Sequence, residues 1–584
     1  MKKHYETHVE DTDKLISVAG PVLDYKSWYE QYRKLMEEQA QRKYGLYTPT
    51  SEGDDDDFPS IPGMIARYST LGLTNEQMKE NPVWVDKTGN GHDLQMKNFL
   101  WGGMSGVGGY VGDFSKWVNN RDTTEIGITK SNSKVIIDVK VSQGSGKNIV
   151  FISKSNLGIS NNVTIKITST YPEGVMKFAN SASNKYLKLP SNGIITLQDN
   201  PEYTSNEMHL HLASADLGQI TIEQLPLYPG ALVFDGVDDY GTCNNFPILT
   251  KEKGYTVVVL RQWDQDFLNT TLTGGLLSTR NYSTGEGVAF EKIESSNKGY
   301  WNLGAGGIID FAKSPFTWQT SKQYNNVGIL KGDKNHGKPL CVGSGLSGGQ
   351  QCGRFAIWEL VFLDHDATEE ELTKIKDYFV KTYSWLFPDQ AWTVTGKTNE
   401  DEDRATIANI TGNGNDLVLS NFGFAEGSGY NEEGEYAGYL VTDGVDDVIT
   451  SSTFEMGNDW TVIGDWELIN TGKKDNAGIV KFDSIVIYNY NPILINIKNG
   501  RNNLIPDQNT VNAICSDGRI YSKDWKESIY NEETESTSKN LLTIGYSGNS
   551  YTKIAFKNLA IYPTVLSKED CIKAYNYLQT LKAK

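Results

Sequence analysis

The chain has 584 residues and is acidic, with 73 Asp and Glu against 55 Lys and Arg and a formal net charge of −18. This charge, without a basic patch, argues against nucleic acid and anionic membrane as partners, because both are polyanions. No run approaches the ~18 apolar residues of a membrane span. The N-terminus turns charged at once, so we expect no signal peptide and synthesis in the cytosol. The five widely spaced Cys predict reduced, mostly buried thiols.

Residues 1–50 are predicted to form an N-terminal helical anchor, because residues 24–43 place Trp28, Tyr32 and Leu35 at helical spacing. Residues 51–60 follow as an acidic, extended linker. A short helix on a tether cannot bury its apolar stripe on itself. We therefore expect it either to dock or oligomerise through that stripe, or to fold back on the domain that follows.

Three sequence motifs occur twice, in the same order. Residues 232–240 (LVFDGVDDY) recur at 440–448 (LVTDGVDDV), and residues 88–94 (TGNGHDL) recur at 411–417 (TGNGNDL). Downstream, ELVF before Thr368 corresponds to NLAI before Ser567. Motifs repeated in one order indicate two copies of one domain. The first copy spaces its motifs more widely, which predicts an insertion of about 115 residues, enough for a small domain.

The expected fold class is all-β, since β-branched and aromatic runs alternate with Asn-Gly and Asp-Gly turns. The first copy is predicted at residues 61–114 and 229–383, and the second at 384–584. The inserted β-sandwich is predicted at 115–228, where residues 134–141 alternate apolar and polar side chains. Each copy closes with a helix, capped by Thr368 with Glu371 and by Ser567 with Asp570.

This pattern resembles the concanavalin A-like jelly rolls of the laminin-G type, whose microbial variants carry an Asp-x-x-Gly-Asn-Gly-x-Asp turn, a Phe-Asp-Gly-x-Asp-Asp-Tyr turn and a closing capped helix. The first copy carries these at 86–93, 234–240 and 368–383. The second copy has Asn409, Thr442 and Val448 where the first has Asp86, Phe234 and Tyr240. The resemblance implies two jelly-roll sandwiches, the first interrupted by the insert. Any ligand or ion site is expected to be weaker in the second copy.

The clustered carboxylates of Asp86, Asp235, Asp238 and Asp239 are a candidate calcium site, because Ca²⁺ prefers oxygen ligands. Calcium is the one cofactor that the sequence suggests. The same turns also have an explanation without a ligand. Asp-Gly and Asn-Gly supply the positive φ of tight connections, and the carboxylates bind freed backbone donors.

No catalytic motif is convincing, so we expect no enzymatic activity. The Glu-x-Asp-x-x-Glu signature of jelly-roll glycanases is absent, although glycoside hydrolysis needs two suitably separated carboxylates. The Gly-x-Ser-x-Gly match at 345–349 lies in a glycine-rich loop rather than at a strand-to-helix turn.

Aromatic residues in Gly- or Asn-rich surroundings are candidates for carbohydrate binding, because sugar rings stack on Trp and Tyr. They are Trp101, Trp117, Tyr300, Trp301 and Trp318. Their surroundings predict loops, which commonly carry binding sites on rigid sandwiches. The alternative is that these side chains fill the core.

A helix, a linker and tandem lectin-like sandwiches resemble the layout of a bacteriophage virion appendage, a tail or head fibre. In this interpretation the N-terminal segment binds other virion proteins and the sandwiches bind a host surface glycan. The protein would be made in the host cytoplasm, reside in the virion and form a homo-oligomer, with a trimer as the expected state. One alternative is a bacterial surface carbohydrate-binding module protein accessory to glycan degradation, which predicts an upstream signal peptide. Another is an enzyme with an unrecognised site between the inserted and host domains.

Overall fold

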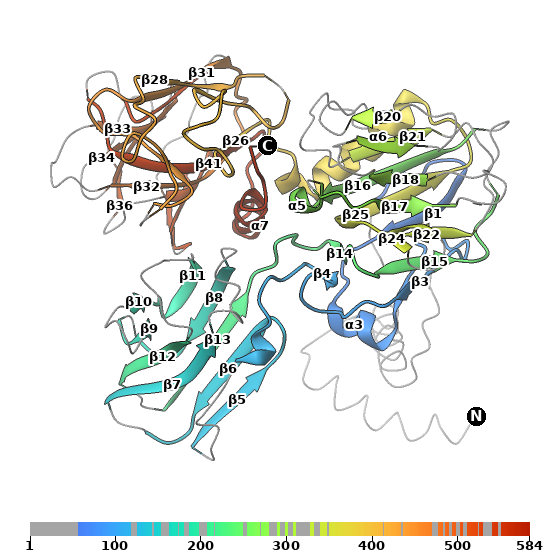
Figure 1. Ribbon diagram of the computed structural model, residues 1–584, viewed down its shortest axis with the longest axis horizontal. Coiled ribbons are helices and arrows are strands. Elements are labelled where there is room, and N and C mark those ends of the chain that lie inside the picture. Colours follow the sequence, from blue (N-terminus) through green and yellow to red (C-terminus); the bar gives the residue numbers. More distant parts are fainter. Residues whose placement is uncertain are drawn as a thin grey trace, which may run out of the picture. The chain divides into compact units, whose positions relative to one another are not determined.

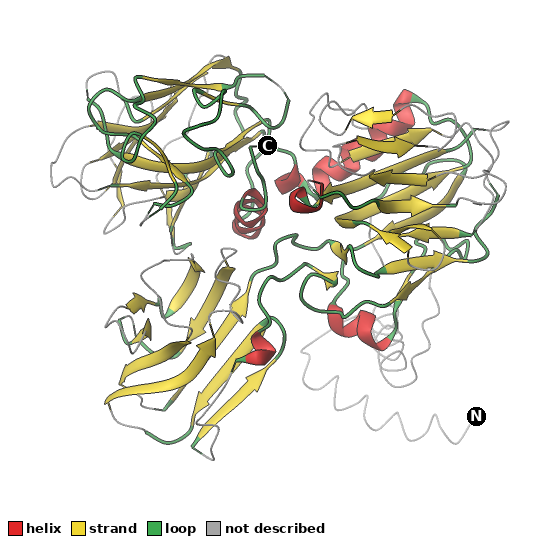
Figure 2. Ribbon diagram, in the orientation of Figure 1, coloured by secondary structure: helices red, strands yellow, loops and turns green. Residues whose placement is uncertain are grey.

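The computed structural model describes residues 57–583 with gaps, and strands predominate among them (Figure 2). The gaps are 118–124, 143–144, 154–162, 173, 180–185, 198–206, 215–216, 249–253, 269, 280–288, 293–297, 302–307, 311–326, 332–338, 347–349, 413, 434–435, 470–476, 483–484, 490–492, 498–502, 506–510, 524, 530–539 and 547–549. The predicted N-terminal anchor and most of the acidic linker lie outside the described residues. The all-β class is confirmed for the described part of the chain.

The first copy contains two sheets that share a core (Figure 1). One has the order β21 (Val327–Lys331), β16 (Thr256–Trp263), β25 (Arg354–Leu363), β14 (Leu232–Asp235), β4 (Gly106–Val107), with β1 (Met64–Ser69) beside β25. The other has the order β2 (Val83–Trp84), β3 (Leu94–Lys97), β15 (Tyr240–Cys243), β22 (Leu340–Val342), β17 (Gly274–Ser278), β18 (Ala289–Lys292), β19 (Lys298–Trp301), β20 (Ile308–Asp310), with β23 (Ser344–Leu346) and β24 (Gln350–Cys352) attached through β17. Phe234 and Phe355 of the first sheet pack with Trp84 and Leu277 of the second, which makes this copy a β-sandwich.

The second copy is also built from two sheets around a core of its own. One has the order β29 (Gly429–Asn431), β30 (Tyr439–Val441), β41 (Ile554–Tyr562), β32 (Thr461–Leu468), β37 (Val511–Cys515), β38 (Arg519–Ser522), β39 (Glu527–Ile529), with β26 (Gln390–Thr393) beside β41. The other has the order β27 (Thr406–Ile407), β28 (Leu417–Ser420), β31 (Val448–Phe454), β40 (Asn540–Ile544), β33 (Ala477–Phe482), β34 (Ile485–Asn489), β35 (Ile493–Ile497), β36 (Asn503–Ile505).

The two copies share one strand order. The path β21-β16-β25-β14-β4 corresponds to β37-β32-β41-β30-β29, and β1 corresponds to β26. The β16–β25 and β32–β41 pairs also have an irregular register at the same place. It lies between Leu260 and Arg261 in the first pair and between Asp465 and Trp466 in the second. The motifs repeated in the sequence therefore mark repeated structure, down to the position of a β-bulge.

A closing helix covers one sheet in each copy: α6 (Glu369–Thr382) in the first and α7 (Lys568–Leu578) in the second. The predicted capping box of Thr368 and Glu371 is confirmed, and Ser567 accepts the N–H of Asp570. Buried apolar side chains of both helices belong to one cluster that also contains the outer faces of β25 and β41. The shorter helices are α3 (Asn75–Glu80), α5 (Gln265–Leu268), η1 (Phe114–Lys116) and η3 (Ser384–Leu386).

The chain between β4 and β14 forms two further sheets, which do not pair with the other described sheets. One has the order β11 (Asn192–Leu197), β8 (Val163–Ser169), β13 (Gly218–Gln224), β6 (Lys134–Val139), β5 (Ile126–Lys130). The other has the order β10 (Tyr186–Lys188), β9 (Met176–Ala179), β12 (Glu207–Ser214), β7 (Ser145–Ser153). Their shared core includes Val135, Ile137 and Leu210, in agreement with the predicted alternation along β6. None of the helices in the described part of the chain has the length and apolar character needed to cross a bilayer.

Candidate functional site

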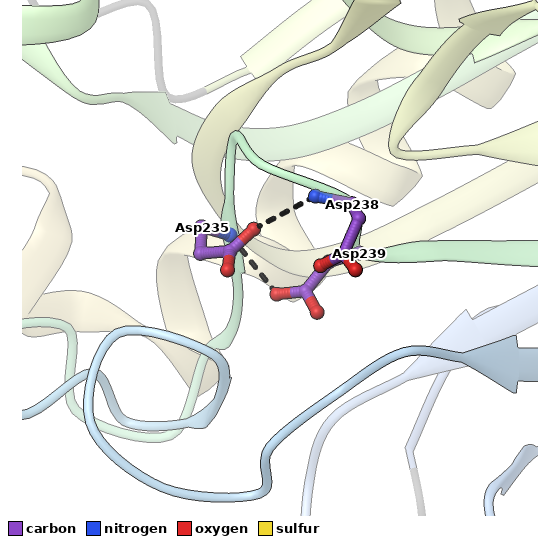
Figure 3. Close-up of side chains that lie close together, drawn as sticks. All are labelled: Asp235, Asp238 and Asp239. Carbon is purple, nitrogen blue, oxygen red and sulfur yellow. Dashed lines mark hydrogen bonds between the residues drawn. The ribbon is translucent and has the colours of Figure 1, made fainter. Parts of the chain in front are cut away.

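The turn at residues 235–239 joins β14 to β15 and is held together by its own carboxylates (Figure 3). Asp235 Oδ1 accepts the backbone N–H groups of Val237 at 2.8 Å and Asp238 at 3.4 Å, and Asp239 Oδ2 accepts that of Asp235 at 3.0 Å. Gly236 has φ +77°, and a Cβ there would lie 2.8 Å from the Cβ of Arg354. The sequence Asp-Gly-x-Asp-Asp is therefore explained by backbone geometry and local hydrogen bonds.

A second loop, residues 98–105, is bound to this turn. Ser105 Oγ donates to Asp239 Oδ1 at 2.9 Å and accepts the N–H of Leu100 at 2.8 Å. Asn98 Nδ2 donates to the backbone oxygen of Asp238 at 3.0 Å. We call residues 98–105 and 235–239 together the first corner. Its surface includes the side chains of Leu100 and Val237, each 74% exposed.

The second copy repeats this arrangement at residues 421–428 and 443–447, which we call the second corner. Asp443 Oδ1 accepts the N–H of Val445 at 2.7 Å, and Asp447 Oδ2 accepts the N–H of Asp443 at 2.8 Å. Ser428 Oγ donates to Asp447 Oδ1 at 3.1 Å, and Asn421 Nδ2 donates to the oxygen of Asp446 at 2.9 Å. The replacements at Thr442 and Val448 thus leave the corner's hydrogen bonds in place.

Burial perturbs one carboxyl group in each corner. The side chain of Asp239 is fully buried, and burial together with the nearby Asp235 raises its pKa from 3.8 to about 7 despite the hydrogen bonds that it accepts. Burial also raises the pKa of Asp447. Each corner therefore holds a carboxyl group that is more easily protonated than an exposed one.

Three of the four predicted calcium ligands lie together. Asp235, Asp238 and Asp239 each offer a carboxylate oxygen within 4.8 Å of the others, as do Asp443, Asp446 and Asp447. Asp86 does not join the first group, so its assignment to that site is wrong. Its carboxylate instead accepts the N–H groups of Thr88 and His92 in its own turn and of Arg67 in β1. Because Ca²⁺ takes about six to eight oxygen ligands, three carboxylates supply only part of a shell, and calcium binding stays a prediction.

The structure separates the predicted aromatic ligands. Trp117 is fully buried in the core of the inserted sheets, 4.5 Å from the ring of Phe114, so its assignment as a sugar platform is wrong. Trp101 lies in the first corner, partly buried, with its ring stacked on Phe99 at 4.7 Å. Tyr300 and Trp301 lie in β19 rather than in a loop, and their side chains are outside the described part. Trp318 is also outside the described residues.

Asn98 and Ser105 were missed as corner residues, although the sequence contained a signal. Asn and Ser recur at the same spacing in the second copy, as Asn421 and Ser428. These polar residues, which hold the acidic motif in place, lie upstream of it and outside the three repeated motifs.

A buried ion pair in the first copy was also missed. Arg67 of β1 contacts Glu359 of β25 through Nε at 3.1 Å and Nη2 at 3.2 Å, and both side chains are buried. Tyr383 donates to Glu359 Oε1 at 2.9 Å, and Arg67 donates to the hydroxyl of Tyr378 on α6 at 3.0 Å. The ring of Phe58 covers the guanidinium at 3.9 Å. Enclosed in this way, the pair joins two strands and the closing helix.

No family model and no curated protein matches the chain. Among solved structures, a Trypanosoma rangeli sialidase in complex with sialic acid is 9% identical, with a TM-score of 0.24 over 78% of this chain and 85% of that one. The botulinum neurotoxin serotype D binding domain is 10% identical, with a TM-score of 0.22 over 58% of this chain and 88% of that one. Scores this low support no inference about fold or function.

Proposed function

We propose that the chain is a non-enzymatic structural and adhesive protein, a bacteriophage tail or head fibre whose two laminin-G-type jelly rolls bind glycans on the host surface. The observation that carries this proposal is the corner, which occurs twice with equivalent hydrogen bonds on sandwiches of one strand order. Loops held rigidly on a sandwich are a common place for binding sites.

The first corner offers the chemistry that sugars require. Asp238 is exposed and provides carboxylate oxygens for sugar hydroxyls, while Leu100 and Val237 provide apolar contacts for the ring face. Trp101 adds a partly exposed aromatic ring. The second corner retains Asp446 and Val445 but has Gly423 where the first has Leu100, so the first corner is the stronger candidate.

The hydrogen bonds that the corner carboxylates accept support binding rather than hydrolysis. Asp235 and Asp239 accept hydrogen bonds from backbone N–H groups of their own turn, and Asp239 accepts one from the Ser105 hydroxyl of the neighbouring loop. A glycoside hydrolase instead positions two carboxyl groups on either side of the scissile bond. In this proposal the N-terminal residues bind other virion proteins, the subunits assemble as a trimer, and the protein is made in the host cytoplasm.

A glycan array and a whole-cell binding assay with the full chain test adhesion directly. Asp238→Ala should weaken binding by about tenfold, the loss expected for one or two charge-assisted hydrogen bonds. The matched variant Asp446→Ala should weaken it less. Equal binding by both variants and the unmodified chain would contradict the corner as the site, and failure to bind any host envelope would contradict adhesion.

Virion attachment needs a separate experiment. Mass spectrometry of purified virions should detect the polypeptide, and deletion of residues 1–56 should abolish its incorporation while the sandwiches still fold. A signal peptide encoded upstream of this reading frame would instead favour the accessory protein of a glycan-degrading bacterium.

A further inference from the structure

Two cysteines of the second copy meet beneath its closing helix. Cys515 is the last residue of β37, and Cys571 lies in the first half of α7. Both side chains are 0% exposed, and their thiol groups hydrogen-bond each other. The contact therefore joins a strand to the helix that covers it.

Thr461 of β32 fixes the surroundings of this pair. Its Oγ1 lies 3.8 Å from Cys515 Sγ, accepts the N–H of Leu566 at 2.9 Å and donates to the oxygen of Thr564 at 2.8 Å. Cys571 Sγ lies 4.0 Å from the oxygen of Leu566. The segment that leads into α7 is thus tied to the sheet beside both sulfurs, by hydrogen bonds that do not depend on the thiols.

The first copy builds the same fold without cysteines at these positions. Lys331 pairs with Thr256 where Cys515 pairs with Thr461. Leu372, four residues after the cap of α6, takes the place of Cys571. The packing of a closing helix therefore does not require a thiol pair beneath it.

The thiol at Cys515 is also suited to begin an exchange reaction. The hydrogen bond from Cys571 lowers the pKa of Cys515 and raises that of Cys571, and the guanidinium of Arg519 also lowers the pKa of Cys515. Arg519 is held in place by Asp517, at 2.7 Å, and by the oxygen of Leu566, at 3.0 Å. A thiolate is the attacking species in thiol–disulfide exchange.

We infer that Cys515 and Cys571 form an intrachain disulfide when the protein meets a low-molecular-weight disulfide such as oxidised glutathione. The Cys515 thiolate attacks one sulfur of glutathione disulfide, which breaks that S–S bond and releases one glutathione thiolate. The Cys571 thiolate then attacks Cys515 Sγ and releases the second glutathione. Two protein thiols are oxidised, and one glutathione disulfide is reduced to two glutathione thiols, which take up the two protons that the cysteines lose.

Burial makes this oxidation depend on the opening of α7, because neither sulfur is accessible in the closed fold. Once formed, the bond closes the chain between residues 515 and 571 and restricts the unfolded state, so the oxidised protein should be the more stable one. This inference does not depend on glycan binding. The protein folds in reduced form and becomes cross-linked in an oxidising environment.

The test uses the full chain incubated with oxidised glutathione in sub-denaturing urea, followed by removal of both reagents. Digestion with trypsin under non-reducing conditions should yield peptides 502–519 and 569–573 joined by a disulfide. The thermal midpoint of the oxidised protein should rise by several degrees, and a reductant should reverse the rise. Without urea the cross-link should form more slowly.

Cys571→Ser should abolish both the linked peptides and the rise, whereas Cys243→Ser should leave both in place. If Cys571→Ser does not fold, the peptide map of the unmodified chain decides. Free thiols at both positions after complete treatment would overturn the inference. Pairing of either cysteine with another partner, or a cross-link that leaves the thermal midpoint unchanged, would also overturn it.

Discussion

Replacing Asp239 with Asn should flatten the dependence of unfolding free energy on pH. The folded pKa of Asp239 is about 7 against an ordinary value of 3.8, so the folded state binds this proton more tightly than the unfolded chain does. Its contribution to stability is complete below about pH 4 and is lost as the pH rises through about 7. Integrating the shift from pH 5 to pH 8, at about 1.4 kcal/mol per unit, gives a loss of roughly 2–3 kcal/mol that the variant should lack.

Asp239→Asn removes the titrating group with little change in structure, because Asn has nearly the same shape as Asp. The carbonyl oxygen of the new side chain can accept the N–H of Asp235, whose nitrogen lies 3.0 Å from Asp239 Oδ2. Its NH2 group can donate to Ser105 Oγ, which lies 2.9 Å from Asp239 Oδ1. The corner should therefore keep its geometry while losing its titration.

The full chain is unfolded with urea at a series of pH values, and unfolding is monitored by tryptophan fluorescence. The informative quantity is the difference in unfolding free energy between the variant and the unmodified protein at each pH, since other titrating groups cancel in it. Asp447→Asn is the matched control and should change the pH dependence of the second sandwich in the same direction. A difference that stays constant within about 0.5 kcal/mol from pH 5 to pH 8 would refute the reasoning.

Arg67→Met should destabilise the first sandwich by about 3–5 kcal/mol in urea unfolding, because it leaves Glu359 buried without its ion-pair partner; a loss below 1 kcal/mol would contradict this. Gly236→Ala should cost more stability than Gly230→Ala. Both glycines have positive φ, but only at Gly236 would an added Cβ meet other atoms within 4 Å, and equal thermal midpoints of the two variants would disprove the difference. Millimolar calcium should raise the thermal midpoint and lower the pKa of Asp239; an unchanged thermal midpoint would contradict calcium binding.

The repeated motifs predicted the duplicated fold because each has a local physical cause. Gly236 must adopt positive φ, and Thr368 must satisfy the first N–H groups of α6, so these residues mark turns and helix starts wherever they occur. Neighbouring residues in the sequence were enough for such predictions. The capping box and the alternation of β6 are confirmed for the same reason.

Contacts between distant residues account for the errors. Asp86 and Asp235 belong to similar acidic motifs, but the sequence does not show that their turns use separate sets of backbone donors. Trp117 follows a Gly-rich segment that predicts a loop, yet its ring completes the core of sheets formed much later in the chain. Tyr300 and Trp301 illustrate the same limit, because pairing of β19 with β18 and β20 overrides a composition that favours loops.

The two copies differ under their closing helices but share the hydrogen bonds that hold their corners. Arg67 and Glu359 form an ion pair in the first copy, whereas Ala391 and Asn558 occupy the equivalent places on β26 and β41. Neither amide atom of Asn558 hydrogen-bonds to a described protein atom. Stability therefore rests on different contacts in each sandwich, since a buried charged pair has been exchanged for neutral groups. Each hydrogen bond described for the first corner nevertheless has a counterpart in the second, although two residues adjoining the turn, Thr442 and Val448, differ from those of the first copy. Backbone geometry and local hydrogen bonds are enough to account for this shared corner, so the Asp238→Ala binding experiment, rather than the repeat itself, tests the proposed function.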